Sequence, residues 1–254
     1  WSIGAGALLV RELPVPGSKY FIGADFSEGI SEGSEKDSDS HCFIVADETG
    51  RWVACYLSKI PSSEIWMDLV LLAIYYNNAI VGGELNSTGH SVLNSQVLKT
   101  GYPFLFEDTF ALPHARRVDR RWVRMHRGNR GTILDSWRNT INVDPSRCFS
   151  WPPSLYEDTP LEQFVAFVRS PKTGKVAALQ GYNDDIPMAA AIADYVRQVF
   201  YSMFGNPTAQ VSKPPPKKEE EGTIKFYSGL DLPDNGDMVA VVFKDEDDFF
   251  KFLS

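Results

Sequence analysis

Three short apolar segments follow one another near the start of the chain, and they limit the folds that it can adopt. Residues 19–26, 41–47 and 51–57 each have the length and composition of a β-strand. A polar loop rich in Gly and Ser joins the first two segments, and a short turn joins the last two. Because strands joined without an intervening helix pair antiparallel, these segments predict a three-stranded meander.

A helix and a fourth strand follow the meander. Residues 61–76 begin with Pro, Ser and Glu, which favour a helix start with a Ser cap, and then become apolar. Residues 79–85 (AIVGGEL) predict a short strand, and a helical crossover places such a strand parallel to a neighbour in the same sheet. This order predicts an α/β, ribonuclease-H-like fold, in which helices flank a mixed sheet of three antiparallel strands plus parallel strands. Later elements are expected at residues 86–99 (helix), 102–106 (strand), 132–141 (helix), 165–180 (hairpin) and 184–204 (helix).

Composition suggests three regions of unequal character. With 254 residues, of which 43% are hydrophobic, the chain can bury a core without disulfides or structural metals. We expect one domain over residues 1–209, a linker rich in Pro, Lys and Glu over residues 210–222, and an acidic C-terminal tail over residues 223–254. The three cysteines lack zinc-site spacing and are expected to be reduced thiols. Neither a signal peptide nor an apolar stretch of bilayer-spanning length is apparent, so no membrane association is expected.

Four carboxylates lie at the ends of these predicted elements. Asp25 ends the first strand, Glu84 ends the crossover strand, and Asp184 and Asp185 begin the long helix. Each alone is readily explained as a turn former, a solvated residue or a helix cap. Together, at one edge of a sheet, they would repel one another unless cations were bound, and carboxylate oxygens suit Mg²⁺ or Mn²⁺. Two such ions can activate water and stabilise the leaving oxygen of a phosphodiester.

Other readings of the acids remain open at this point. Paired carboxylates also hydrolyse glycosides, although the order of elements and a strongly basic segment argue against that activity. A phosphate-binding ATPase is excluded for this chain, because no G-x-x-x-x-G-K-[ST] motif occurs in it.

The basic segment contrasts with the rest of the chain. The formal net charge is −8, and the stretch from Lys217 onward has five lysines against ten acids. Residues 116–130 instead have seven arginines against Asp119, at spacings that partly suit one helical stripe. Arginine forks suit phosphate oxygens, which predicts salt-dependent, sequence-neutral DNA contact. A solvated basic face, or an ion-pairing partner for the acidic tail, is the alternative. The arginines are Arg116, Arg117, Arg120, Arg121, Arg124, Arg127 and Arg130.

Three motifs in order resemble the nuclease domain of tailed-bacteriophage large terminase subunits. The stretch IGADFSEG resembles the family's first motif, an apolar strand that ends in Asp. YYNNAIVGGELNSTG resembles the second, in which an acid ends a strand, and GYPFLF resembles the short strand after the next helix. GYNDDIPMAAAIA resembles the third, an Asp pair before a helix rich in Met and Ala. The resemblance covers about residues 19–204.

The resemblance implies a ribonuclease-H-like endonuclease that cuts concatemeric double-stranded viral DNA during packaging. Asp25, Glu84 and either or both of Asp184 and Asp185 match the family's metal-binding acids, which implies two Mg²⁺ or Mn²⁺ ions. It also implies a portal protein and a small terminase subunit as partners, and action in the host cytoplasm on the procapsid. The family's packaging ATPase has no counterpart in this sequence.

Several alternatives stay open. The chain could be another ribonuclease-H-like nuclease of the resolvase or transposase type, or a non-catalytic module that binds DNA and portal. The tail could dock on a partner, or fold over the arginine segment and restrain cleavage. His41, next to the polar loop, could support the acids, but an exposed loop histidine is the expected description.

Overall fold

The computed structural model describes residues 7–27, 40–108, 121–126, 129–144, 147, 167–169, 176–178, 184–205, 225–227 and 239–242. Its helices are α1 (Ile65–Tyr75), α2 (Ser87–Ser95), the 3₁₀-helix η1 (Val97–Thr100), α3 (Arg130–Val143) and α5 (Asp185–Phe204). Its strands are β1 (Ala7–Val10), β2 (Phe21–Asp25), β3 (His41–Ala46), β4 (Trp52–Ser58), β5 (Ile80–Gly83), β6 (Phe167–Arg169), β7 (Val176–Ala178), β8 (Lys225–Tyr227) and β9 (Val239–Val242). Across these ranges, no helix combines the length and apolar character needed to cross a membrane.

The main sheet has the mixed pairing that the sequence predicts. Its described strands lie in the order β5-β2-β3-β4-β1-β9-β8. β2, β3 and β4 pair antiparallel, which confirms the meander, and β5 pairs parallel to β2 after the α1 crossover. β6 and β7 form a separate antiparallel pair where the hairpin was expected. The prediction of a mixed α/β sheet is therefore confirmed.

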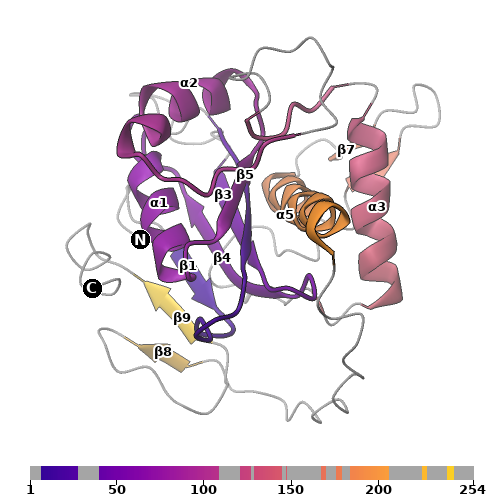
Figure 1. Ribbon diagram of the computed structural model, residues 1–254, viewed down its shortest axis with the longest axis horizontal. Helices are drawn as coiled ribbons and strands as arrows, with labels where there is room; N and C mark the ends of the chain where they lie inside the picture. The colour runs from indigo at the N-terminus through magenta and orange to yellow at the C-terminus, as the bar shows by residue number, and fades with distance from the viewer. Residues whose placement is uncertain are drawn as a thin grey trace.

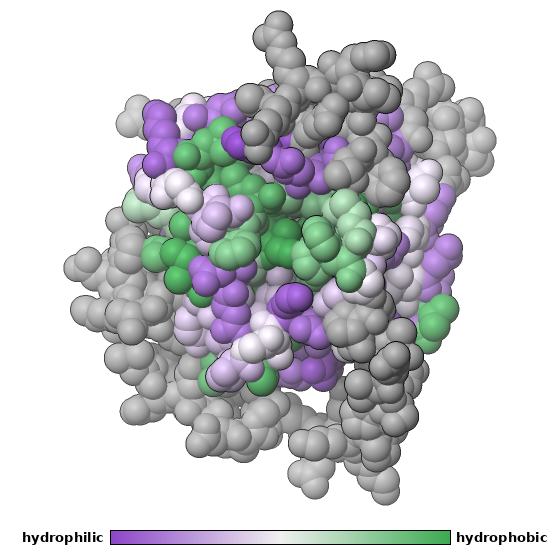
Figure 2. All heavy atoms as spheres, viewed as in Figure 1, coloured by the Kyte–Doolittle hydropathy of each residue, from purple (hydrophilic) through white to green (hydrophobic). Residues whose placement is uncertain are grey.

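Helices cover both faces of this sheet. α1 and α2 lie on one face, α5 lies on the other, and α3 packs against the outer side of α5 (Figure 1). Alternate residues of β2 point into the two cores: Phe21 packs with α5, and Ile22 packs with α1. In the view of Figure 2, hydrophobic residues gather around the place where Figure 1 shows α5 end-on, and hydrophilic residues surround them.

α5 lies unusually close to β2, and Gly23 allows it. A Cβ at Gly23 would lie 2.0 Å from the carbonyl oxygen of Ala189 and 2.3 Å from the amide nitrogen of Ala193. The small residues on this side of α5 complete the close approach. As a result, the helix is fixed along the strand, and its first turn comes to the end of β2 where Asp25 lies.

β1 has no counterpart among the strands predicted from the sequence. It pairs antiparallel with β4 on one side and with β9 on the other. β8 and β9 come from residues 223–254, and their place in the sheet is at the opposite edge from β5. The division of the chain into domain, linker and tail stays a prediction.

Residues 121–126 do not form the helical stripe suggested by the arginine spacing. Instead, Val123 extends the sheet beyond β5: its amide donates to the Gly83 carbonyl at 2.8 Å, and its carbonyl accepts from the Leu85 amide at 2.8 Å. Trp122 has a φ of 63°, which is rare for a bulky residue. Its buried ring stacks on Phe26, with ring centroids 5.2 Å apart and planes at 11°. This packing holds the segment against the end of β2.

Candidate active site

Asp25 and Glu84 meet at the ends of two parallel strands. The amide of Glu84 donates to the Ala24 carbonyl at 2.8 Å, which places the two acids side by side. Asp25 is 8% exposed and Glu84 is half-buried. Burial raises the pKa of Asp25 well above its usual range, and the nearby carboxylates of Glu84 and Asp185 raise it further. A hydrogen bond joins the two side chains, and Asp25, which keeps its proton longer, donates it.

The aspartate pair lies at the start of α5. Asp185 is 5% exposed, and its Oδ2 accepts from the Ser40 amide at 3.1 Å. Asp184 occupies the N-cap position without making a side-chain cap hydrogen bond. Its Oδ2 instead accepts from Nη2 of Arg130 at 3.2 Å. The helix-cap explanation for Asp184 therefore does not account for its side chain.

The structure brings all four predicted acids to one edge of the sheet. Asp184 and Asp185 both contribute to raising the pKa of Asp25, and Asp184 contributes to raising that of Glu84. Their oxygens form a donor set that suits a hard divalent cation. In the part of the chain that is described, however, no three acidic, histidine or cysteine side chains are yet spaced as ligands of one ion. Binding an ion would require these carboxylates to lose shared protons and shift.

His41 is buried, so the expectation of an exposed loop histidine is wrong. It is the first residue of β3 and is 0% exposed. Its Nδ1 accepts from the Ser27 amide at 3.2 Å, so Nε2 carries the proton and donates to the Ile60 carbonyl at 2.9 Å. Burial lowers its pKa to about 4, which keeps the ring neutral. His41 thus holds the chain just after Asp25.

Asn86 is a second supporting residue, and its role was not predicted. Its Oδ1 caps α2 by accepting from the Gly89 amide at 2.7 Å, while Nδ2 donates to the Phe26 carbonyl at 3.1 Å. One side chain thereby ties the chain after Asp25 to the chain after Glu84. An Asn before Ser-Thr signals a helix cap in the sequence, but the second contact depends on the parallel pairing.

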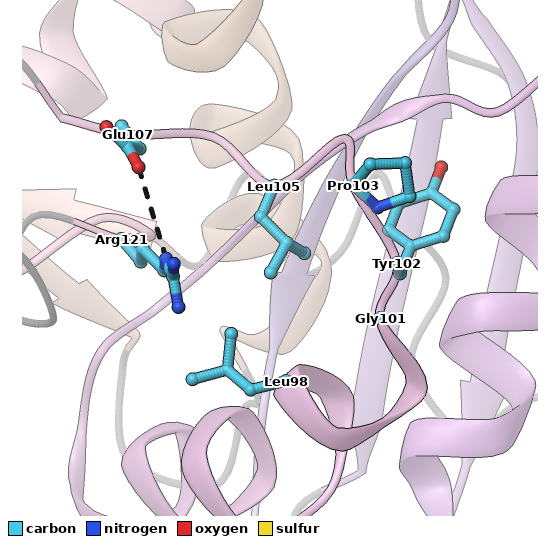
Figure 3. Close-up of a pocket in the computed structure, with 7 residues that line it drawn as sticks. All are labelled: Leu98, Gly101, Tyr102, Pro103, Leu105, Glu107 and Arg121. Atoms are coloured by element: carbon cyan, nitrogen blue, oxygen red, sulfur yellow. Dashed lines mark ion pairs between the residues drawn. The ribbon is translucent and has the colours of Figure 1, made fainter.

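The described arginines have different surroundings. Arg121 is half-buried, and its Nε lies 4.0 Å from Glu107; both residues line a cavity of about 340 Å³ (Figure 3). Arg124 is exposed, with Nη2 3.4 Å from Nε2 of His90. Arg130 contacts the acids. The predicted DNA-binding residues Arg116, Arg117, Arg120 and Arg127 lie outside the described residues.

Comparison with known proteins gives a match in structure only. No family model matches the chain, and no curated sequence does. The large terminase nuclease from thermophilic phage G20c, solved with bound magnesium, superposes with a TM-score of 0.51 at 19% identity, over 73% of this chain and 85% of that chain. The same nuclease solved with bound cobalt gives the same values. The chain shares its fold with a large terminase nuclease.

This similarity confirms the predicted fold class, and it confirms that the chain resembles large terminase nuclease domains in structure. The mixed sheet with flanking helices is the arrangement found in the terminase nuclease. At this level of identity the comparison supports the fold, whereas the roles of individual residues rest on the geometry described above.

Proposed function

We propose that this chain is a metal-dependent endodeoxyribonuclease that cleaves concatemeric double-stranded viral DNA during genome packaging. The observation that carries the proposal is the meeting of four carboxylates from β2, β5 and α5 at one edge of a sheet with a terminase nuclease fold. Similar folds support unrelated activities, so the fold alone would not suffice, and the acid cluster decides the reaction class.

The four acids would hold two Mg²⁺ or Mn²⁺ ions: Asp25 and Glu84 from the strand ends, and Asp184 and Asp185 from the helix. When bound, such a pair of ions activates water and stabilises the attacking and leaving oxygens of a phosphodiester. Asp25 must first give up the proton that it donates to Glu84. His41 and Asn86 hold the chain after Asp25 in place through its backbone, so only the side chains of the acids would have to shift.

The arginine segment would bind the DNA backbone. Arg124 is exposed, beside His90, and Val123 next to it is hydrogen-bonded to the strand that leads to Glu84. Phosphates bound there would lie close to the acids. We propose the same role for Arg121 and Arg130, and for Arg116, Arg117, Arg120 and Arg127. Such contacts carry affinity but no base sequence information.

The packaging context rests on the shared fold. The structural relative is a large terminase nuclease, and we propose that this chain acts in the host cytoplasm with a portal protein and a small terminase subunit. The tail strands β8 and β9 lie at the edge of the sheet opposite β5, and we propose a docking role for this part of the tail.

Plasmid cleavage tests the proposal. Purified protein is incubated with supercoiled plasmid and Mn²⁺, with EDTA as a parallel condition, and the products are resolved on agarose. We expect nicked and linear DNA from wild type and from Glu64→Gln, a matched control at an exposed acid before α1. Asp25→Asn should lose cleavage while unfolding at a melting temperature no lower than that of wild type.

Three outcomes would count against the proposal. Cleavage that survives in Asp25→Asn would remove the acid cluster from the reaction. DNA binding without any metal-dependent cleavage would indicate a non-catalytic module. Cleavage confined to branched DNA, with linear and supercoiled duplex untouched, would indicate a resolvase-type nuclease.

A further inference from the structure

We propose that Arg130 is a positioning residue that serves as the built-in counter-cation of the acid cluster and competes with divalent metal for Asp184. This inference rests on the proposed function, since it assumes that the four acids hold metal. It gives Arg130 a role in the acid cluster that does not depend on the DNA contact proposed for it above.

Arg130 is held in place from the backbone outward. It is the first residue of α3, and its amide donates to the His126 carbonyl at 2.9 Å. The neighbouring Asn129 accepts from the His126 amide at 2.8 Å and donates to the Arg124 carbonyl at 2.9 Å. The turn before α3 is therefore closed by its own hydrogen bonds, and the guanidinium group of Arg130 reaches Asp184 at the start of α5.

The guanidinium group meets the cluster at a partly shielded position. Nη2 lies 3.2 Å from Asp184 Oδ2, and the two side chains are 28% and 34% exposed. The Nε of Arg130 is buried and has no hydrogen-bond partner within the described residues. A buried donor without an acceptor costs free energy, so an arginine placed by hydrogen bonding alone would turn its Nε toward an acceptor. Arg130 instead contacts Asp184 and leaves Nε without an acceptor among the described residues. This arrangement indicates that the negative charge of the acids determines where the guanidinium group lies.

The effect of this cation reaches beyond Asp184. Burial raises the pKa of Glu84, whereas the hydrogen bond from Asp25 and the charge of Arg130 oppose that rise. Several carboxylates at one edge repel one another, and a fixed positive charge reduces the repulsion when no metal is present. A divalent ion that uses Asp184 would have to share the carboxylate with Arg130 or displace it.

Competition predicts a specific effect of substitution. Arg130→Gln should bind Mn²⁺ about threefold to fivefold more tightly than wild type in the absence of DNA, because a competing cation is removed. Arg130→Lys keeps the charge and should bind Mn²⁺ much as wild type does. Arg138→Gln, a matched loss of charge further along α3, should leave Mn²⁺ binding unchanged.

Mn²⁺ titration of the full chain, followed by electron paramagnetic resonance of the free ion, measures these affinities without relying on cleavage. Tighter binding in Arg130→Gln alone supports the inference, and unchanged or weaker binding overturns it. Asp25→Asn is measured alongside. If Asp25→Asn loses Mn²⁺ while Arg130→Gln binds as wild type does, the metal site stands and the counter-cation role fails. If wild type binds no Mn²⁺, the proposed function fails.

Melting temperatures in EDTA test the ion pair without metal. Arg130→Gln and Asp184→Asn should each lower the melting temperature, because each leaves a charge without its partner. The double variant should melt higher than Arg130→Gln alone, since Asp184→Asn then relieves repulsion among the remaining acids. If the double variant instead shows the sum of the two single losses, the two residues do not act on each other and the inference is wrong.

Discussion

Two buried aspartates of α5 show how the same residue type can serve stability at one place and chemistry at another. Asp185 and Asp194 are each 5% exposed. Asp194 accepts from Nη2 of Arg197 at 2.7 Å and from Nε2 of Gln198 at 2.6 Å. Asp185 accepts from a backbone amide and adds its charge to the environment of Asp25. The two aspartates are equally buried, but Asp194 has a positively charged neighbour, whereas Asp185 lies among other carboxylates.

The largest expected effect is the loss of cleavage in Asp185→Asn. Asn keeps an oxygen for the Ser40 amide but removes a negative charge from the cluster. We expect cleavage to fall by about a thousandfold, since a metal ligand supports several kcal/mol of transition-state stabilisation. The melting temperature in EDTA should be unchanged or higher, because like charges repel less. Initial rates on plasmid, measured with calorimetric scans of the same samples, check both parts.

Asp194→Ala should give the opposite pattern. It leaves the 12% exposed side chain of Arg197 without its carboxylate partner, and breaking such a buried pair costs about 3–5 kcal/mol of unfolding free energy. Urea unfolding measures this loss. Cleavage per folded molecule at low temperature should stay near the wild-type rate. If Asp194→Ala remained stable but lost cleavage, the contrast between Asp185 and Asp194 would be wrong, because Asp194 would then belong to the catalytic site.

The pH dependence of stability should differ between wild type and Asp25→Asn. The pKa of Asp25 is higher in the folded state than in the unfolded state. Its protonated carboxyl therefore stabilises the fold at pH values below the unfolded-state pKa, and this stabilisation is lost as the pH rises through the folded-state pKa. Without metal, the melting temperature of wild type should therefore fall relative to that of Asp25→Asn as the pH rises above the usual carboxyl range. Parallel curves for the two proteins would contradict the raised pKa. Asp194→Asn is the control that should not reproduce the effect.

The smallest expected effect concerns an exposed arginine. Arg197 is half-buried in an ion pair with Asp194, whereas Arg124 is exposed beside His90. Arg124→Gln should weaken duplex binding a few-fold and reduce the salt slope of log K by about 1, as expected for one lost phosphate contact. Fluorescence anisotropy at several salt concentrations measures the slope. Arg11→Gln, after β1, should not change it, and an unchanged slope in Arg124→Gln would remove Arg124 from the DNA surface.

Local sequence signals predicted much of the fold. The length and apolar composition of residues 19–26 predict β2, and the order of strand, helix and strand predicts the parallel pairing of β5. The Gly after residue 204 and the Asp pair at 184 and 185 bounded α5. These elements carry the four acids, which is why motif order and strand-end geometry predict that the acids meet at one edge of the sheet.

Features that depend on long-range pairing were missed. β1 is only four residues long and is stabilised by pairing with β4 and β9, which the local sequence does not encode. Trp122 has a positive φ and a ring buried against Phe26, whereas the arginine spacing around it suggests a helix. His41 looked like a loop residue, because its partners, Ser27 and Ile60, are distant along the chain.

A crystal soaked in Mn²⁺ and measured for anomalous scattering tests the central claim most directly. We predict two anomalous peaks among the carboxylates of Asp25, Glu84, Asp184 and Asp185, with Arg130 moved away from Asp184 Oδ2, and no peak at Asp194. Anomalous peaks at other residues, with none at these four acids, would contradict the assignment of this edge of the sheet as the catalytic site.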